Sequence, residues 1–94
     1  MKLTQAEKRW FDRLQRTLAA APESLKKKMR EGKMSSYTVG DPFIVVYDEE
    51  KLAAWKEEQN YMTGYELDVC KMVSFSDAEL YHLDFPFAVE STAG

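Results

Sequence analysis

Three residues in the C-terminal half have side chains that could do chemistry: Cys70, the only cysteine, His82, the only histidine, and Asp84. A thiol, an imidazole and a carboxylate can act as nucleophile, base and orienting acid, or as three ligands of a metal ion. If the segments around Cys70 and His82 pair as a hairpin that turns at Asp77, Cys70 lies opposite Asp84 and diagonal to His82. The same three residues are equally explained as the polar side of a sheet whose other side faces the core.

The arguments against catalysis and against a metal site are stronger. Direct neighbours on a sheet leave little of the cleft that a substrate needs, and nothing in the spacing supplies an oxyanion hole. The sequence has no phosphate-binding glycine loop, no dinucleotide-binding fingerprint, no H-E-x-x-H motif and no pair of cysteines. We therefore expect no enzyme activity, no catalytic residues, no metal and no cofactor, and Cys70 is expected within a strand with no pocket in front of it.

The clearest structural signal is a β-hairpin near the middle of the chain. Two runs rich in β-branched and aromatic residues, 35–39 and 43–48, flank the turn residues Gly40, Asp41 and Pro42. The second run carries apolar side chains on both of its faces, which predicts a central strand covered on at least part of each side.

Two helices are predicted before this hairpin. Thr4 and Glu7 form a T-x-x-E capping box, and an apolar residue recurs every four positions behind it, which predicts a helix over 4–20. This apolar stripe consists of Ala6, Trp10, Leu14 and Leu18. Pro22 and Gly32 are typical of the start and stop of a second, shorter helix. Together the two helices are expected to form a helical hairpin.

A third helix is predicted directly after the β-hairpin. Asp48 suits its N-cap, and Glu49 and Glu50 suit the positive end of its dipole. Its apolar stripe is expected to pack on the sheet, with Gly64 closing the helix. That stripe consists of Leu52, Trp55 and Met62.

The C-terminal third is expected to form a second hairpin. Apolar and polar residues alternate over 66–75, which indicates a strand, although a short helix through Leu67 to Val73 fits as well. The last strand is predicted over 80–85, stopped by Pro86. The predicted order is α-α-β-β-α-β-β: one α+β domain over residues 1–94, a small antiparallel sheet packed by helices, with loose ends at 1–3 and 90–94.

The predicted core combines residues from the helices and from the sheet. Each lies on the apolar side of its element, so all are expected to be buried together. They are Trp10, Leu14, Leu18, Val45, Trp55 and Leu83.

Charge divides the chain into a basic and an acidic part. Residues 1–33 hold ten Lys and Arg against four Asp and Glu, a net charge of +6, whereas residues 34–94 hold three against twelve, a net charge of −9. Such asymmetry can mark a partner surface, or the two parts can attract each other across the fold. No run is apolar enough to cross a membrane, the start is polar, and a single cysteine forms no internal disulfide, so we expect a cytoplasmic protein that does not bind membranes.

Two charged surfaces are candidates for binding a macromolecule. The first is the acidic surrounding of the hairpin turn, chosen because binding residues concentrate on loops that a rigid scaffold carries. Its residues are Gly40, Asp41, Asp48, Glu49 and Glu50. The second is a basic surface on the two N-terminal helices that could contact nucleic-acid phosphates. Its residues are Arg9, Arg13, Arg16, Lys26, Lys27 and Lys28.

Three stretches are similar to a family of small proteins encoded by tailed bacteriophages and prophages of enterobacteria and pseudomonads. They are L-T-Q-A-E-K-R-W-F-D-R-L-Q at the start, Y-T-V-G-D-P-F-I-V-V-Y-D in the middle and H-L-D-F-P-F-A-V-E-S-T-A-G at the end. The resemblance implies an accessory gene product in the infected bacterial cytoplasm and carries over no catalytic residues. We therefore expect a non-enzymatic protein that binds a host or phage macromolecule, with a protein favoured and nucleic acid as the alternative.

Overall fold

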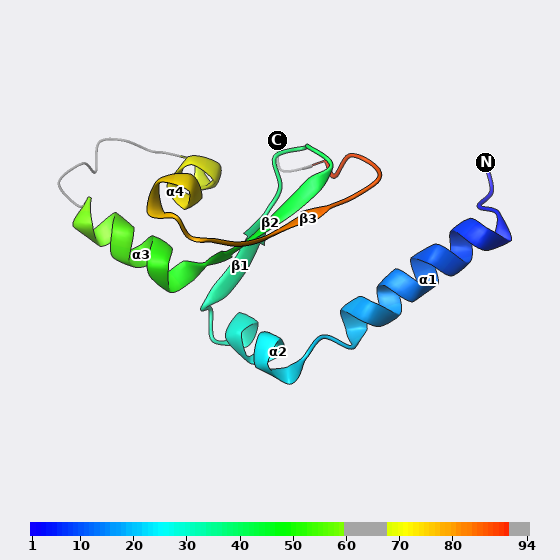
Figure 1. Ribbon diagram of the computed structural model, residues 1–94, viewed down its shortest axis with the longest axis horizontal. Helices are drawn as coiled ribbons and strands as arrows, with labels where there is room; N and C mark the ends of the chain where they lie inside the picture. The colour runs from blue at the N-terminus through cyan, green and yellow to red at the C-terminus, as the bar shows by residue number, and fades with distance from the viewer. Residues whose placement is uncertain (60–67, 91–94) are drawn as a thin grey trace.

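The computed structural model describes residues 1–59 and 68–90 (Figure 1). In these residues the chain forms four helices and three strands, which confirms the predicted α+β class. In chain order the elements are α1 (Gln5–Ala19), α2 (Glu23–Arg30), β1 (Met34–Tyr37), β2 (Phe43–Asp48), α3 (Glu49–Glu58), α4 (Val69–Ser76) and β3 (Glu79–Asp84).

The sheet is antiparallel, with β2 between β1 and β3. Tyr37, Val45 and His82 form one row across it, and the register of β3 shifts between Val46 and Tyr47 of β2. The predicted hairpin and the central position of its second strand are confirmed. Gly40 in the turn has a φ of +88°, a conformation that glycine adopts without steric cost.

The strand predicted over 66–75 is wrong where the structure describes it, because Val69–Ser76 is helix α4. The Asp68 side chain caps this helix by accepting a hydrogen bond from the backbone N–H of Lys71 at 2.9 Å. Val69, Met72 and Val73 follow one another at helical spacing and reach the core. The short-helix alternative over Leu67 to Val73 is correct for Val69 to Val73, and the helix continues to Ser76, while Leu67 lies outside the described residues. The alternating pattern and the helical pattern share these positions.

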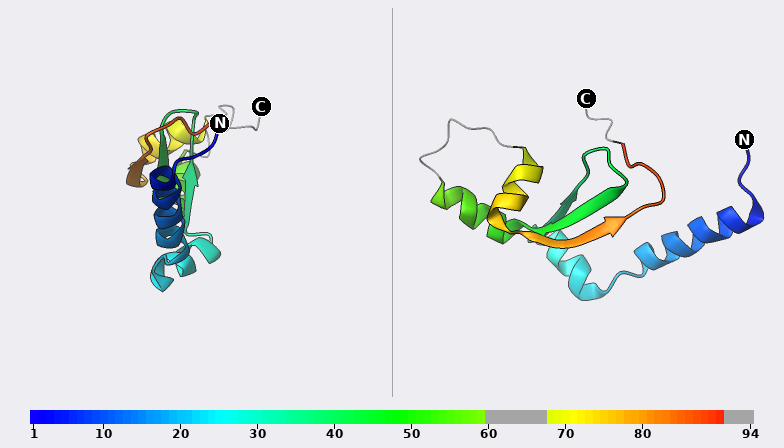
Figure 2. Two further views of the ribbon diagram at one scale, coloured as in Figure 1. Left: turned by 90° about the vertical axis from the view of Figure 1, so that its right-hand side faces the viewer. Right: turned by 45° about the horizontal axis from the view of Figure 1, so that its top comes forward.

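The two predicted N-terminal helices form, but they do not fold back on each other. The capping box is present, with Thr4 Oγ1 accepting from the Glu7 N–H at 3.1 Å and Glu7 Oε1 accepting from the Thr4 N–H at 2.7 Å. In Figures 1 and 2 α1 and α2 follow each other around a bend and do not lie side by side. The stripe of α2, only Leu25 and Met29, is too narrow to cover α1. We call residues 1–33 the helical arm.

The buried core lies on one face of the sheet, beneath α3 and α4. It consists of Val45, Tyr47, Leu52, Val73 and Ala78, with Tyr37, Phe43, Val69 and Met72 packed against it. Asp48 caps α3 as predicted, by accepting from the Lys51 N–H at 3.0 Å, and Leu52 carries the predicted stripe of α3 into the core. Met62 and Gly64, assigned to the same helix from the sequence, lie outside the described residues.

The predicted core is correct for Val45 and wrong for three other residues. Trp10 and Leu83 are each 37% exposed, and Leu18 is 56% exposed, whereas Leu14 and Trp55 are half-buried. The physical reason is the position of α1, which has no buried residue and extends away from the layer that α3 and α4 form with the sheet (Figure 1).

The molecule is elongated. Its radius of gyration is 16.4 Å and its extents are 55 × 31 × 19 Å, whereas a compact chain of this length has a radius of gyration near ~12 Å. Its accessible surface is 7598 Å², about 2,000 Å² more than the ~5,600 Å² expected of a compact protein of this mass. A large area that a compact fold would bury is therefore open.

Candidate interaction surface

The C-terminal residues 85–89 and the turn between β1 and β2 form one hydrogen-bonded unit. The Phe85 N–H donates to the Pro42 carbonyl at 2.8 Å, and the Val89 N–H donates to the Asp41 carbonyl at 3.3 Å. Thr38 Oγ1 donates to the Val89 carbonyl at 3.1 Å. These bonds hold the backbone on both sides of Phe87. The position of Phe87 is therefore fixed, although this residue lies beyond the last strand.

Phe87 meets two aromatic side chains of α1. Its ring stacks on Phe11 with centroids 6.1 Å apart and meets Trp10 edge-on at 6.5 Å. Trp10 and Phe11 are themselves 4.9 Å apart, also edge-on. Such aromatic pairs attract each other beyond the area they bury. This contact joins the helical arm to the C-terminal segment.

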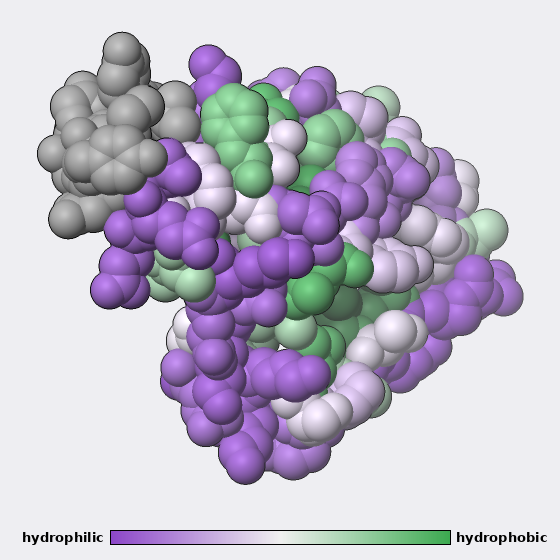
Figure 3. Space-filling view, turned by 60° about the vertical axis from the view of Figure 1, so that its left-hand side comes forward, coloured by the Kyte–Doolittle hydropathy of each residue, from purple (hydrophilic) through white to green (hydrophobic). Residues whose placement is uncertain are grey.

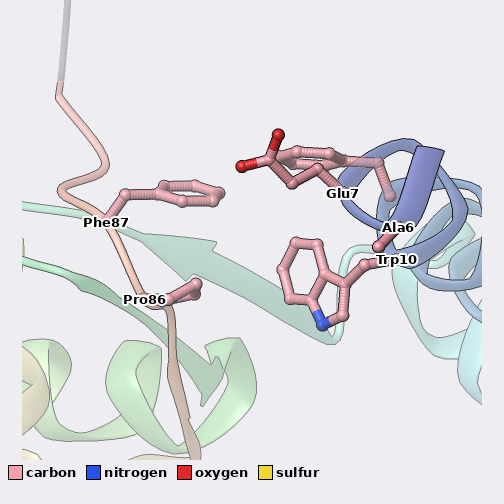
Figure 4. A pocket seen from close by; sticks show the side chains of 6 residues that line it. Ala6, Glu7, Trp10, Pro86 and Phe87 are labelled. Carbon is pink, nitrogen blue, oxygen red and sulfur yellow. The ribbon is translucent and has the colours of Figure 1, made fainter. Parts of the chain in front are cut away.

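A cleft of about 420 Å³ lies between these two segments (Figure 4). Its walls are Ala6, Glu7, Trp10 and Phe11 on one side and Pro86 and Phe87 on the other. We call it the aromatic cleft. The three aromatic side chains remain 37–44% exposed, so the cleft presents ring faces and edges to whatever enters it.

The aromatic cleft can bind an apolar group and has little means of acid–base chemistry. Its one ionisable wall residue is Glu7, whose carboxylate already accepts the Thr4 N–H. Hydrogen bonds from the backbone and side chain of Thr4 hold the pKa of Glu7 below its usual range. No sequence pattern indicated this cleft, because its two walls come from opposite ends of the chain. The local signal was Phe85-Pro86-Phe87, an aromatic pair around a proline.

The predicted acidic surface does not form one patch. Gly40 and Asp41 precede β2, whereas Asp48 is its last residue and Glu49 and Glu50 begin α3. The length of the six-residue strand, roughly 20 Å, therefore separates the two groups. Asp48 caps α3, and Glu49 Oε1 accepts a hydrogen bond from the Tyr47 hydroxyl at 3.0 Å. Burial, followed by this bond to Glu49, raises the pKa of Tyr47.

The proposed hairpin of Cys70, His82 and Asp84 is wrong. β3 pairs with β2, and Cys70 lies on α4 and not in a strand. His82 Nε2 lies 3.1 Å from Asp84 Oδ1. The nearest match to the predicted polar group is therefore a two-residue contact on one strand.

The Cys70 side chain meets Tyr37 and lines a small hollow, so the expectation of no pocket in front of it is wrong too. The hollow has a volume of about 260 Å³ and is lined by Tyr37, Cys70, Val73, Ser74, Asp77 and Glu79. Burial, followed by a side-chain hydrogen bond with Cys70, raises the pKa of Tyr37 to about 12. Within residues 1–59 and 68–90 there is no group of three or more His, Cys, Asp or Glu side chains that could hold a metal ion.

The basic residues lie exposed along the helical arm. Arg9, Arg13 and Arg16 follow one another at helical spacing on α1. Lys26, Lys27 and Lys28 are consecutive on α2 and so point in different directions around it.

Among the described residues, no ion pair joins the basic residues 1–33 to the acidic remainder of the chain. Two ion pairs lie within the arm, Arg30–Glu23 at 2.7 Å and Lys33–Glu31 at 3.9 Å. Two lie within the acidic part, Lys51–Asp77 at 3.7 Å and His82–Asp84 at 3.1 Å when His82 is protonated. The net charge of the arm is thus not neutralised by contacts with its own sheet.

The chain matches no known protein family, no curated protein and no solved structure. In the part of the chain that the structure describes, no helix is long and apolar enough to span a membrane.

Proposed function

We propose that the chain is a non-enzymatic binding protein that holds an apolar segment of another protein in the aromatic cleft. The observation that carries this proposal is the grouping of Trp10, Phe11 and Phe87 around an open cleft. Large aromatic side chains that surround a concave, partly exposed site are typical of the residues that dominate binding energy in protein interfaces.

The setting proposed for this binding is the cytoplasm of a bacterium that carries a phage or prophage, and the partner is a host or phage protein. This part of the proposal rests on the resemblance of the three sequence stretches to phage-encoded proteins. The F-P-F stretch that is part of this resemblance supplies Pro86 and Phe87, which form one wall of the aromatic cleft.

The test compares Phe87→Ala with Phe75→Ala in affinity capture from bacterial lysate, with bound proteins identified by mass spectrometry. Phe75 is a matched control because it is an exposed phenylalanine on α4 that pairs with Trp55 and lies outside the cleft. We expect a protein that the parent and Phe75→Ala retain and that Phe87→Ala loses by tenfold or more. Equal recovery by all three chains contradicts the proposal, as does the absence of any specific protein.

The second candidate function is nucleic-acid binding through the basic surface, favoured by the exposed row of Arg9, Arg13 and Arg16 on α1. Phosphate contacts release counterions, so the affinity for DNA should fall steeply with salt concentration. Fluorescence anisotropy with labelled duplex and single-stranded DNA measures this. An absence of binding at low salt removes the candidate.

A further inference from the structure

The central strand of the sheet has two apolar faces, and only one of them is fully covered. Val45 and Tyr47 point to α3 and α4 and are buried, whereas Ile44 and Val46 alternate with them, point the other way and are half-buried. The β3 partners of Ile44 and Val46 are Leu83 and Tyr81, which are 37% and 64% exposed. We call these four residues, Ile44, Val46, Tyr81 and Leu83, the open sheet face.

The end of α1 nearest α2 carries a matching apolar surface. Leu14 and Leu18 are one helical turn apart on the stripe of α1, and Leu18 is 56% exposed. The contact of Trp10 and Phe11 with Phe87 holds the other end of α1 against the C-terminal segment. Figure 3 shows hydrophobic residues recessed in a hollow on one side of the molecule. In this arrangement neither apolar surface is fully covered by its own chain.

An exposed helix of this length also needs a partner to be stable. α1 has 15 residues and none of them is buried. Isolated helices shorter than about 12–15 residues are marginal in water, and most helical stability in proteins comes from packing of the apolar face. The capping box supports the first turn of α1, but it does not replace this packing.

We propose that a second copy of this chain covers both surfaces, with Leu14 and Leu18 of one copy packed on the open sheet face of the other. The exchange is reciprocal, so one two-fold axis relates the copies and each supplies the same two surfaces. This dimer uses different residues from the aromatic cleft and does not depend on the function proposed for it.

Charge selects this arrangement over a pairing of the two arms. Each arm has a net charge of +6 and the rest of each chain −9. Arm against arm brings like charges together, whereas arm against the sheet of the other copy brings opposite charges together. Among the described residues of one chain, no ion pair joins the arm to the acidic part.

The total exposed area of the chain is compatible with such a dimer. The chain exposes about 2,000 Å² more than a compact protein of its mass. If each copy buries about half of that excess, the interface covers about 2,000 Å² in total, which is within the range of stable homodimers.

The test is sedimentation equilibrium of the full chain from micromolar to several hundred micromolar concentration. The matched variants are Leu18→Gln and Leu3→Gln, because both leucines are 56% exposed, both lie in the arm, and only Leu18 belongs to the stripe. We expect the parent and Leu3→Gln to form a dimer of twice 10.9 kDa. Leu18→Gln, and Leu83→Gln on the opposing surface, should each raise the dissociation constant tenfold or more. Circular dichroism of both variants in dilute solution should match the parent, since neither side chain is buried.

Three results overturn the proposal. The first is a parent chain that is monomeric at every concentration. The second is a dimer that Leu18→Gln and Leu3→Gln leave equally stable, which would place the interface elsewhere. The third is a dimer that strengthens markedly with added salt across the low-salt range, because attraction between the arm and the acidic part must weaken when salt screens it.

Discussion

Two regions of this molecule have similar apolar patterns and opposite surroundings. On one face of β2, Val45 is 2% exposed beneath α3 and α4. On the other face Ile44 and Val46 lie beside exposed partners, and the stripe of α1 has no buried residue. An apolar pattern therefore specifies which side of an element leaves water, but it does not specify whether the covering surface belongs to the same chain.

The largest expected effect is a difference in lost stability between a substitution in the core and one in the arm. Leu52 on α3 is buried, and Leu18 on α1 is exposed. Leu52→Ala should lower the free energy of unfolding by about 2–4 kcal/mol, because it leaves a cavity in the core. Leu18→Ala, measured in dilute monomer, should change it by less than about 0.5 kcal/mol, as expected of an exposed site. Urea denaturation measures both, and equal losses would show that the arm is part of the core.

Two glycines, one in the core hairpin and one in the arm, both have a positive φ. Gly40 in the hairpin turn has φ +88° and Gly32 at the end of the arm has φ +70°, and an added Cβ would meet nothing within 4 Å at either position. Replacement by alanine therefore adds only backbone strain, about 1–2 kcal/mol. We expect Gly40→Ala to lower the urea midpoint clearly and Gly32→Ala to lower it less. The reverse order would contradict the separation of arm and core.

Acid should loosen α1 before it affects the core. The pKa of Glu7 lies below its ordinary value of 4.5 because the carboxylate accepts hydrogen bonds from Thr4. Its contribution to the helix is therefore fully present above pH 4.5 and is lost as the pH falls through the lowered pKa. The expected result is a loss of α1 helicity in dilute acid, seen in α1 amide chemical shifts. Thr4→Ala is the control, because it has no capping box to lose, and an identical acid response in both chains would contradict the assignment.

Alkali should lower the stability of the core, with a smaller effect than the changes above. The pKa of Tyr37 is raised to about 12 by burial and by its hydrogen bond with Cys70, from an ordinary value of 10. Its contribution to stability is complete below pH 10 and is lost as the pH rises through about 12. Denaturation at pH 9 and near pH 11.5 should show a smaller loss for Tyr37→Phe than for the parent. Equal losses would remove Tyr37 as the cause.

The local elements followed from the sequence to a large extent. Thr4, Gly40, Asp48 and Gly32 act on the backbone within a few residues, so their caps, turns and stops could be predicted. Helix α4 could not be separated from a strand, because Val69 and Val73 suit both periods and the capping role of Asp68 was not recognised. The error there removed the proposed Cys70, His82 and Asp84 hairpin.

The tertiary arrangement and the candidate site could be predicted from the sequence to a much smaller extent. The aromatic cleft depends on where residue 87 meets α1, and no local pattern encodes that distance. The acidic residues near β2 were grouped by their closeness in sequence, yet a strand holds its two ends apart. The stripe of α1 predicts burial of Trp10 and Leu18 only if the same chain covers it, and in the structure both residues are exposed.

Amide hydrogen exchange of the full chain at several protein concentrations tests whether a second copy covers the arm. It should show a marked gain in protection of α1 amides as concentration rises, because they exchange by local opening at low concentration. Amides of α3, on the covered face of the sheet, should gain no more than the overall stability that dimer formation adds. This result places the second copy on the arm. If α1 is fully protected at the lowest concentration, the arm is covered by its own chain. If it stays unprotected at the highest concentration, no second copy covers it, and either result contradicts the account.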